Sequence, residues 1–501
     1  MDLNYYDEIG SEDYTEYQYD SMPTLTLTRQ TSYSIIRAED LEKLRNNLIQ
    51  ECEEYTCLDR DEATLLLISF QWNMDSLKDK WYEDTEENRR KCGLDFTKEA
   101  LAVLMKKRVN QNNEECYICT APRDNTFFGL KCGHFFCGDC WVAYLENKLE
   151  DVLTCISSTC PQEGCNYVIP ENVFKIFIKG PRIKEFEKVI YKNFTDNNVD
   201  MKWCPAPDCG ICVRSLTHFG KEITCECGNV FCFKCGREGH RPCQCELVEA
   251  WIVKNNSESE NVKWLQANTK KCPGCHKFIE KNQGCNHMTC RKEAGGCGFE
   301  FCWICMGEWK PHGSNYYQCN QFNTESVKKQ ESSAQQAKFE LERYIWHFDR
   351  FANHDRAMHL SIKMKNHINT EIQTFISLKN LPYDEVRFLE DAVETITKSR
   401  RTLKNTYNFA FYMKDCKERQ LFEHNQFLLE INADKLHEMM ENETKRKLLE
   451  VDNYEQFMKE WNNFKANVTN LATVTVKYQE NLLNEIENRM MDLVDYQKIN
   501  K

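Results

Sequence analysis

The sequence contains no apolar run long enough to cross a bilayer. Its longest, Leu65 to Ile68 with its flanks, falls far short of the roughly 20 residues that a membrane-spanning helix needs. The first residues, MDLNYYDEIGSEDYTEYQYD, are acidic and lack the apolar segment of a secretory signal. We therefore expect a soluble protein of the cytoplasm, with the nucleus as a second location, where thiols stay reduced.

The sequence also has no excess of positive charge. Lys and Arg number 65 against 78 Asp and Glu, which gives a formal net charge of −13. Because nucleic-acid binding relies on basic patches, a zinc-finger protein that binds DNA or RNA is disfavoured. An acidic chain favours basic protein partners instead, so we expect neither nucleic acid nor a membrane as a partner.

Cysteine, by contrast, is abundant: the chain of 501 residues has 29. In a reducing compartment, cysteines at C-x2-C spacing indicate metal sites rather than disulfides, and structural zinc takes four thiolate or imidazole ligands. The phrase Phe-Cys-x2-Cys recurs at Phe136, Phe231 and Phe301, which suggests three related modules. The length exceeds what one core supports, so about two to four domains are expected.

The first zinc module is expected over residues 114–168. Its C-x-H-x2-C-x2-C core is typical of RING fingers, and its eight ligands fill two zinc sites: Cys116, Cys119, Cys132, His134, Cys137, Cys140, Cys160 and Cys165. Cys155 competes with Cys160 or Cys165, and spacing alone leaves that choice open. Ile118 and Trp141 are expected as exposed apolar residues beside the ligands, where they either cover the zinc or bind a partner.

The second module is expected over residues 201–246, again with two zinc sites. Its ligands are Cys204, Cys209, Cys225, Cys227, Cys232, Cys235, His240 and Cys245. Cys212 and Cys243 are left over, and on spacing alone Cys243 could replace Cys245. No spare residue stands beside a base, so a structural role is favoured.

The third module, residues 271–320, has one potential ligand more than two zinc ions need. One site takes Cys272, Cys275, Cys290 and Cys297, and the other takes Cys302, Cys305, His312 and Cys319, which brings the expected total to six Zn²⁺ ions. Cys285, in Gly284-Cys285-Asn286-His287, is left without a metal. A nearby imidazole can lower the pKa of a thiol and make it a nucleophile. The alternatives are that another cysteine is the spare one, or that Cys285 is a small buried hydrophobe.

Apolar spacing and composition predict the rest of the chain. Before the zinc modules we expect a disordered acidic tail (1–35), a three-helix domain (38–83) and a linker (84–113). Between the modules we expect a helical connector (169–200) and a helical linker (247–270), with a hinge at residues 255–261 of that linker. After the modules we expect an all-α region (325–501). The fold class is therefore multidomain, with three small zinc modules between helical ends.

Three successive zinc modules, the last with an unligated Gly-Cys-Asn-His, resemble the RING-in-between-RING (RBR) E3 ubiquitin ligases. The phrases Cys302-Trp-Ile-Cys305, Trp309-Lys-Pro-His312-Gly-Ser and Tyr407-Asn-Phe-Ala-Phe-Tyr412 are similar to the Ariadne subfamily. The likeness covers roughly residues 38–500. It implies a ubiquitin-associated-like N-terminal domain, a RING1, an IBR and a catalytic RING2 module, and a C-terminal Ariadne domain. It also favours Cys160, Cys165 and Cys245 as ligands.

The resemblance implies an E3 ubiquitin transferase. RING1 would bind a ubiquitin-charged conjugating enzyme at Ile118 and Trp141, and ubiquitin would pass to Cys285 as a thioester and then to a substrate lysine. His287 matches the family's general base and Glu300 its supporting carboxylate. The alternatives are that His287 is a surface histidine or one that only supports the site, and that Glu300 is an ordinary solvated strand residue.

The resemblance also implies regulation. In Ariadne proteins the C-terminal domain covers the catalytic module, and the N-terminal helices sense the ubiquitin-like modifier on an active cullin-RING ligase. RING ligases that form no thioester often carry Arg or Lys beside the last zinc ligand, where it holds the charged conjugating enzyme closed. In this sequence Gly164 and Asn166 flank Cys165, and the absence of such a cation fits a thioester route.

Two features depart from the family. Six residues separate Cys290 from Cys297 where four are usual, and Gln283 stands where glycine is common.

The alternative function is a zinc-rich scaffold that binds a conjugating enzyme or ubiquitin and transfers nothing.

Overall fold

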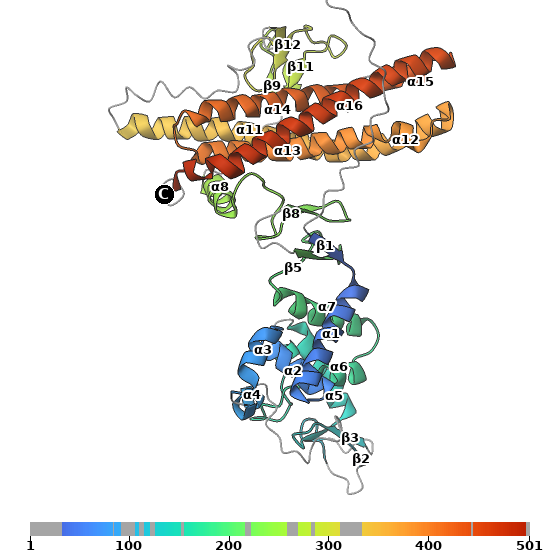
Figure 1. The fold of residues 1–501 in the computed structure, drawn as a ribbon, viewed down its shortest axis with the longest axis vertical. Coiled ribbons are helices and arrows are strands. Elements are labelled where there is room, and N and C mark those ends of the chain that lie inside the picture. Colours follow the sequence, from blue (N-terminus) through green and yellow to red (C-terminus); the bar gives the residue numbers. More distant parts are fainter. Residues whose placement is uncertain are drawn as a thin grey trace, which may run out of the picture.

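A computed structural model describes most of the chain. The described residues are 33–83, 85–91, 106–109, 115–120, 126–151, 155–215, 222–257, 269–281, 286–310, 333–441 and 444–496. The helices of residues 333–496 form a bar, which separates the third zinc module on one side from a stem of smaller domains, formed by the described parts of residues 33–257, on the other (Figure 1). None of the helices in these ranges is both long and apolar enough to span a membrane.

Three helices open the stem, as the apolar spacing predicts. They are α1 (Ala38–Thr56), α2 (Arg60–Ser69) and α3 (Met74–Trp81). The Asp59 side chain caps α2 by accepting from the Glu62 amide, and the Asn73 side chain caps α3 in the same way. Their core includes Phe194 from a later helix, so the three helices pack on the zinc modules rather than standing apart.

A short strand precedes these helices. β1 (Tyr33–Ile36) pairs antiparallel with β6 (Cys212–Ser215), whose other edge pairs with β5 (Met201–Trp203). Residues 33–35 therefore do not belong to a disordered tail, and that part of the sequence prediction is wrong. Residues 1–32, where the rest of the predicted tail falls, lie outside the described part.

The first zinc module contains a three-stranded sheet and a helix. The strands are β2 (Lys106–Val109), β3 (Thr126–Gly129) and β4 (Phe135–Cys137), followed by α5 (Gly138–Glu150) and a 3-10 turn, η2 (Cys155–Ser157). The expected linker thus holds a helix, α4 (Thr85–Lys91), and also β2, which completes the module's sheet by pairing with β3.

Trp141 is not on the surface. Its side chain is fully buried, stacks on Phe177 and donates its indole N–H to the Phe128 carbonyl at 2.9 Å. The expectation of an exposed Trp141 is wrong because position 141 falls on the inner face of α5, which spacing from Cys140 does not reveal. Ile118 is 47% exposed, as expected.

Helices and short hairpins connect and build the next two modules. α6 (Glu171–Phe177) and α7 (Pro181–Asp196) break at Gly180, as predicted, and the second module adds β7 (Glu222–Thr224), β8 (Val230–Cys232) and α8 (Cys245–Ser257). The third module has two hairpins, β9 (Thr269–Lys271) with β10 (Phe278–Glu280), and β11 (His287–Thr289) with β12 (Glu300–Cys302).

The predicted hinge does not begin at Asn255. That residue lies inside α8, and its side-chain amide hydrogen-bonds with the Tyr344 hydroxyl at 3.0 Å. Residues 258–261, the end of the predicted hinge, lie outside the described part.

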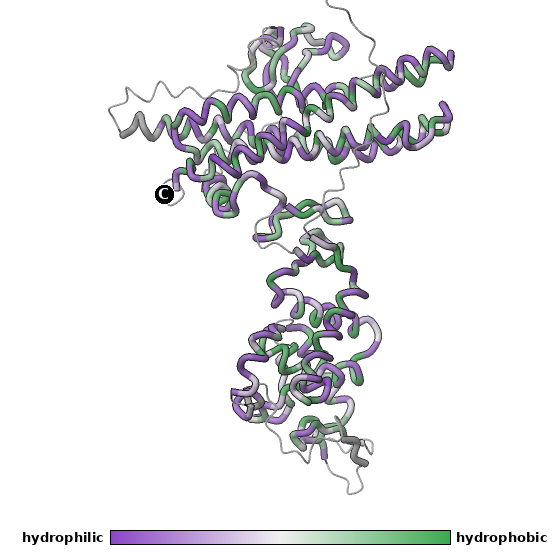
Figure 2. The backbone as a smooth tube through the Cα atoms, in the orientation of Figure 1, coloured by the Kyte–Doolittle hydropathy of each residue, from purple (hydrophilic) through white to green (hydrophobic). Residues whose placement is uncertain are grey.

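The C-terminal region is all helical, as predicted. It comprises α11 (Ser333–Lys379), α12 (Tyr383–Val386), α13 (Phe388–Tyr412), α14 (Glu418–Glu441), α15 (Thr444–Leu449) and α16 (Tyr454–Glu485), with short π and 3-10 turns η5 (Ile486–Met490) and η6 (Met491–Leu493). Figure 2 shows apolar and polar residues alternating along these helices. Every residue from Ser399 to Tyr412 is buried, so α13 is the centre of the bar.

Candidate functional site

Within the part of the chain that the structure describes, five groups of four ligand side chains converge in the three modules. In each group the ligand atoms lie within 4.8 Å of one another. The groups are Cys116/Cys119/Cys137/Cys140, Cys132/His134/Cys160/Cys165, Cys204/Cys209/Cys225/Cys227, Cys232/Cys235/His240/Cys245 and Cys272/Cys275/Cys290/Cys297.

The spacing of the sulfur atoms fits zinc. A tetrahedral ion with Zn–S bonds of about 2.3 Å separates its sulfurs by about 3.8 Å. The Cys116–Cys140 sulfurs are 3.8 Å apart and the Cys272–Cys297 sulfurs 3.7 Å apart. Thiolates and imidazoles are the donors that zinc prefers, so the five groups suit zinc in both chemistry and geometry.

The cysteines that spacing left open fall outside these groups. Cys155 is buried in η2, and Cys212 is buried in β6. Cys243 is fully buried and donates its thiol to the Asn405 carbonyl at 3.0 Å, while Cys245 joins the ligand group.

The sixth candidate group is described only in part. Cys302 and Cys305 stand at the end of β12, whereas His312, Cys319 and the proposed nucleophile Cys285 lie outside the described residues. The described residues that follow Cys285 directly in the chain are Asn286 and His287, and His287 begins β11.

Asn286 is buried against the helical bar. Its side-chain oxygen accepts from Lys281 Nζ at 2.9 Å and from Asn353 Nδ2 at 2.8 Å, and Lys281 Nζ also donates to Asn353 Oδ1 at 2.5 Å. Its amide nitrogen lies 3.3 Å from Glu430 Oε1 and 3.3 Å from Asp434 Oδ2. Since Asn353 is on α11 and the two carboxylates are on α14, the residue after Cys285 is locked to two helices.

The two carboxylates that hold Asn286 are themselves held in place. Arg400 Nη2 donates to Asp434 Oδ1 at 2.5 Å, and the Tyr407 hydroxyl donates to Glu430 Oε2 at 2.9 Å. Burial opposes ionisation of Glu430, but nearby His354, Tyr407 and Arg400 outweigh it and bring its pKa to about 2. A charged, preorganised acceptor pair therefore faces the loop.

His287 lies between two carboxylates. Its Nε2 is 3.4 Å from Glu300 Oε2, its Nδ1 is 3.7 Å from Glu438 Oε1 on α14, and its ring stacks on Trp309 at 4.3 Å. Burial disfavours the imidazolium, but Glu438 and Glu300 outweigh that and raise the pKa of His287 above its ordinary value. The structure therefore places His287 next to Glu300. It also places Glu438 next to His287, a contact that spacing along the sequence does not predict.

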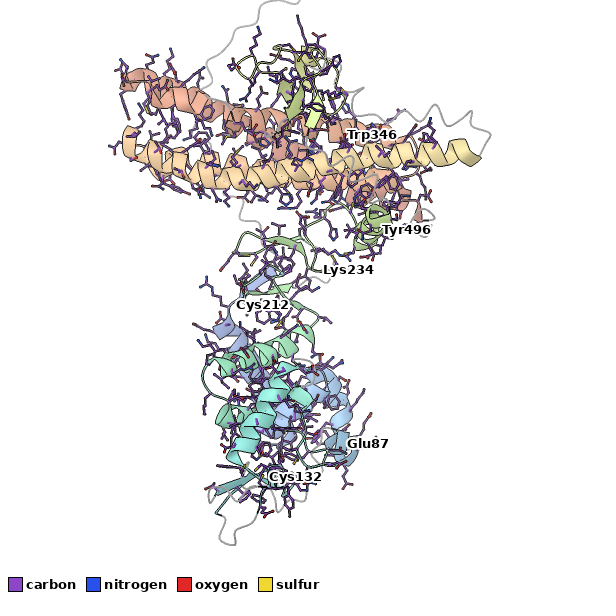
Figure 3. All side chains as sticks on the ribbon, turned by 180° about the vertical axis from the view of Figure 1, so that it is seen from behind. Glu87, Cys132, Cys212, Lys234, Trp346 and Tyr496 are labelled. Atoms are coloured by element: carbon purple, nitrogen blue, oxygen red, sulfur yellow. The ribbon has the colours of Figure 1, made fainter. Side chains whose placement is uncertain are left out.

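The second module is also docked on the helical bar. Arg241 makes a two-pronged ion pair with Glu487 at 2.5 and 2.7 Å, and Lys404 pairs with Glu238 at 2.8 Å. Trp251 of α8 is buried among aromatic side chains of the bar. Figure 3 shows Tyr496 beside α8, where its hydroxyl donates to Gln244 at 2.9 Å.

Comparison with known families is consistent with this architecture. Models of the IBR domain match residues 184–245, where the domain is described as a half RING-finger, and residues 267–321. A model of the Ariadne domain matches residues 342–500.

Curated relatives match over most of the chain. A Dictyostelium discoideum protein named "Probable E3 ubiquitin-protein ligase rbrA" is 32% identical over 97% of this chain and 96% of its own length. E3 ubiquitin-protein ligase ARIH1 of Homo sapiens is 34% identical over 79% of this chain and 72% of its own. E3 ubiquitin-protein ligase ariadne-1 of Drosophila melanogaster is 31% identical over 82% and 81%.

Proposed function

This chain belongs to the Ariadne subfamily of RBR E3 ubiquitin ligases, and we propose from that premise that it transfers ubiquitin through a thioester on Cys285. The Cys285 thiolate attacks the thioester carbonyl of a charged conjugating enzyme, whose cysteine leaves as thiolate. A substrate lysine amine then attacks the new thioester, and the Cys285 thiolate leaves.

The observation that carries this proposal is the pairing of a spare cysteine with a histidine that two carboxylates face. Among the described residues, Cys272, Cys275, Cys290 and Cys297 already form a complete group of four ligands, and His287 follows Cys285 by two residues in the sequence. A lysine is a nucleophile only after its ammonium loses a proton, and His287 is the base that accepts it. Glu300, 3.4 Å from Nε2, stabilises the imidazolium that results.

The zinc ions are structural in this proposal. Six Zn²⁺ ions hold the three modules, the sixth through Cys302, Cys305, His312 and Cys319. Exposed Tyr117 and Ile118, on the loop between the first ligands, offer the conjugating enzyme an apolar surface, with buried Trp141 supporting the module's core from within.

We further propose that the Ariadne domain holds the enzyme inactive. The contacts of Asn286 with α11 and α14 fix the chain beside Cys285, and Glu438 lies against the base His287. Both must separate before a conjugating enzyme and a substrate can reach the same loop. Binding of a modified cullin-RING ligase to the N-terminal, ubiquitin-associated-like helices and the bar is the proposed trigger, in the cytoplasm or the nucleus.

The test is to incubate the protein with charged conjugating enzyme and look for a reductant-sensitive ubiquitin adduct. We expect the adduct with the wild type and none with Cys285→Ala, while Cys416→Ala, at a cysteine of the helical region that belongs to none of the described ligand groups, serves as the matched control. An adduct that survives Cys285→Ala contradicts the proposal. No adduct even with a chain ending at residue 325, which lacks the proposed inhibitory domain, would instead favour the zinc-rich scaffold.

His287→Ala separates the two transfers. We expect it to load ubiquitin onto Cys285 and to slow discharge onto free lysine by about 100-fold, the effect of losing a positioned general base. The measurement is single-turnover discharge of the isolated adduct. Loss of loading instead would assign His287 to the first transfer or to the fold.

A further inference from the structure

A groove of about 590 Å³ crosses the third zinc module beside the proposed base His287. Strands β10 and β11 both line it, and so does the loop between the zinc ligands that follow them. Among the described residues, none from the helical bar lines it, so the docking of the module on the bar does not use this groove. The lining includes Lys277, Ile279, Glu280, His287, Arg291 and Ala294.

The loop that follows Cys290 is longer than in the family, with six residues before the next ligand where four are usual. Lys277 Nζ donates to the Ala294 carbonyl, and the Gly296 amide donates to the Arg291 carbonyl at 2.8 Å. A Cβ on Gly296 would lie 2.6 Å from the Cys290 sulfur, so the loop needs glycine where it passes this ligand. These contacts make the longer loop a fixed wall of the groove.

The strands that line the groove each have an edge without a strand partner. β10 pairs with β9 and β11 pairs with β12, and among the described residues each of these two sheets has no third strand. Such an edge accepts a further segment in extended conformation through main-chain hydrogen bonds. The groove therefore suits a peptide segment.

The two ends of the groove differ in charge. Glu280 ends β10 and His287 begins β11, so both lie at the end next to the loop that carries Cys285. Lys277 directly precedes β10, about 10 Å from Glu280 at three residues along a strand, and Arg291 comes shortly after β11. Within the described residues Arg291 makes no ion pair, and Lys277 bonds to a neutral carbonyl, so this far end has positive charge that no carboxylate neutralises there.

We propose that this groove binds the substrate segment that carries the acceptor lysine, and that it prefers an acidic side chain about three residues from that lysine. The inference rests on the proposed transfer from Cys285 and concerns its second step only. Glu280, beside His287, attracts the lysine ammonium, while Arg291 at the far end pairs with the acidic side chain. The lysine then loses its proton to His287, its amine attacks the thioester carbonyl, and Cys285 leaves as thiolate.

The test is single-turnover discharge of ubiquitin from the isolated full-length adduct onto peptides that contain one lysine each. Three peptides differ only at the two positions three residues before and after the lysine, which are both Glu, both Gln or both Arg. We expect the Glu peptide to reach its half-maximal rate at a concentration about three- to ten-fold lower than the Gln peptide, and the Arg peptide at a higher one. The maximal rates should be similar, because the flanking charges act on binding.

A charge reversal at the far end tests the assignment. Arg291→Glu should reverse the order of the peptides, so that the Arg peptide becomes the better acceptor. Lys459→Glu, at an exposed lysine of α16, makes the same change in net charge and is the matched control. Discharge onto free lysine, measured for each protein, is the reference for the chemistry.

Added salt gives a readout that needs no substitution. In the wild type the preference for the Glu peptide should shrink between about 0.05 and 0.5 M salt, because exposed charges are screened. A preference that does not change with salt would overturn the inference. So would equal half-maximal concentrations for the three peptides, or the same order of peptides in the wild type and Arg291→Glu.

Two further outcomes separate this inference from the proposed function. If Arg291→Glu slows adduct formation from the charged conjugating enzyme and leaves the order of peptides unchanged, the groove holds ubiquitin rather than the substrate, and the inference is wrong. An adduct that discharges onto free lysine but equally onto all three peptides overturns the inference and leaves the proposed function intact. The absence of any adduct would overturn both.

Discussion

At the scale of single residues, the contact beside Cys285 depends on buried charges that hold one another in place. Asn286 has no charge of its own, yet it links Lys281 with Glu430 and Asp434, which Arg400 and Tyr407 hold in place. Sequence spacing could identify Cys285 and His287 because their chemistry is local. It could not identify Glu438 or Asn353, because they meet the loop only through the packing of distant helices.

The His287–Glu438 contact predicts a pH dependence. A histidine whose pKa is raised in the closed state stabilises that state fully below its ordinary value of 6.5, and this contribution is lost as pH rises through the raised pKa. We therefore expect Glu438→Gln to speed adduct formation about two- to five-fold near neutral pH, the size of effect expected from a half-exposed ion pair. The ratio of the Glu438→Gln rate to the wild-type rate should shrink as pH rises.

The measurement is the initial rate of adduct formation for both proteins across a pH series. Because ionisation of the Cys285 thiol affects both proteins, the ratio of their rates at each pH cancels that contribution. Glu455→Gln, at an exposed glutamate of the same domain, is the matched control. A ratio that stays constant or grows with pH would show that His287 does not contribute to closure through its charge.

At the scale of elements, the parts that sequence predicts are those built by neighbouring residues. The knuckles with their buried Phe136, Phe231 and Phe301, and the three helices after residue 38, follow from short-range spacing. Strand β1 was missed because its partner strand is far away in the chain: Tyr33 pairs with Ser215 of β6. Trp141 was misplaced because ligand spacing does not say which face of α5 points inward.

The pairing of β1 with β6 gives an element-scale prediction. Ile36 is 6% exposed and packs in the core that α1, α2 and β6 share. Ile36→Ala should destabilise this core by about 2–4 kcal/mol, as for other buried Ile→Ala changes, and should speed hydrogen exchange in β6. Ser34→Ala, at an exposed position of the same strand, is the control, and equal exchange in both variants would mean that β1 does not hold the second module.

At the scale of the whole molecule, the zinc modules and the helical bar are stabilised in different ways, the first by bound metal and the second by apolar packing. The zinc modules have small cores, and each bound ion can contribute about 10–16 kcal/mol, comparable with the net stability of a domain. The helical bar is built instead on two apolar clusters that both include residues of α13, and none of the described ligand groups lies in it.

Removal of zinc should therefore act on one part of the molecule first. With excess chelator we expect rapid hydrogen exchange throughout the three modules, while amides of α13 stay protected and most helical circular dichroism remains. Chelator premixed with excess zinc is the control. Simultaneous loss of protection in α13 would show that the bar depends on the modules for its fold.

The bar stands between the third module and the stem, so the closed arrangement is a property of the whole chain (Figure 1). Asn353 is the residue best suited to test it. The described hydrogen bonds of its side chain go to Lys281 and Asn286 of the third module, so its loss weakens docking without removing a contact inside the bar.

The most direct measurement is the single-turnover rate at which full-length protein forms the reductant-sensitive adduct, compared between wild type and Asn353→Ala. Loss of buried hydrogen bonds should raise the rate about ten-fold, toward that of a chain ending at residue 325, while Asn366→Ala, exposed on the same helix, leaves it unchanged. Equal rates for wild type, Asn353→Ala and the shortened chain would contradict the claim that the helical domain holds the catalytic loop closed.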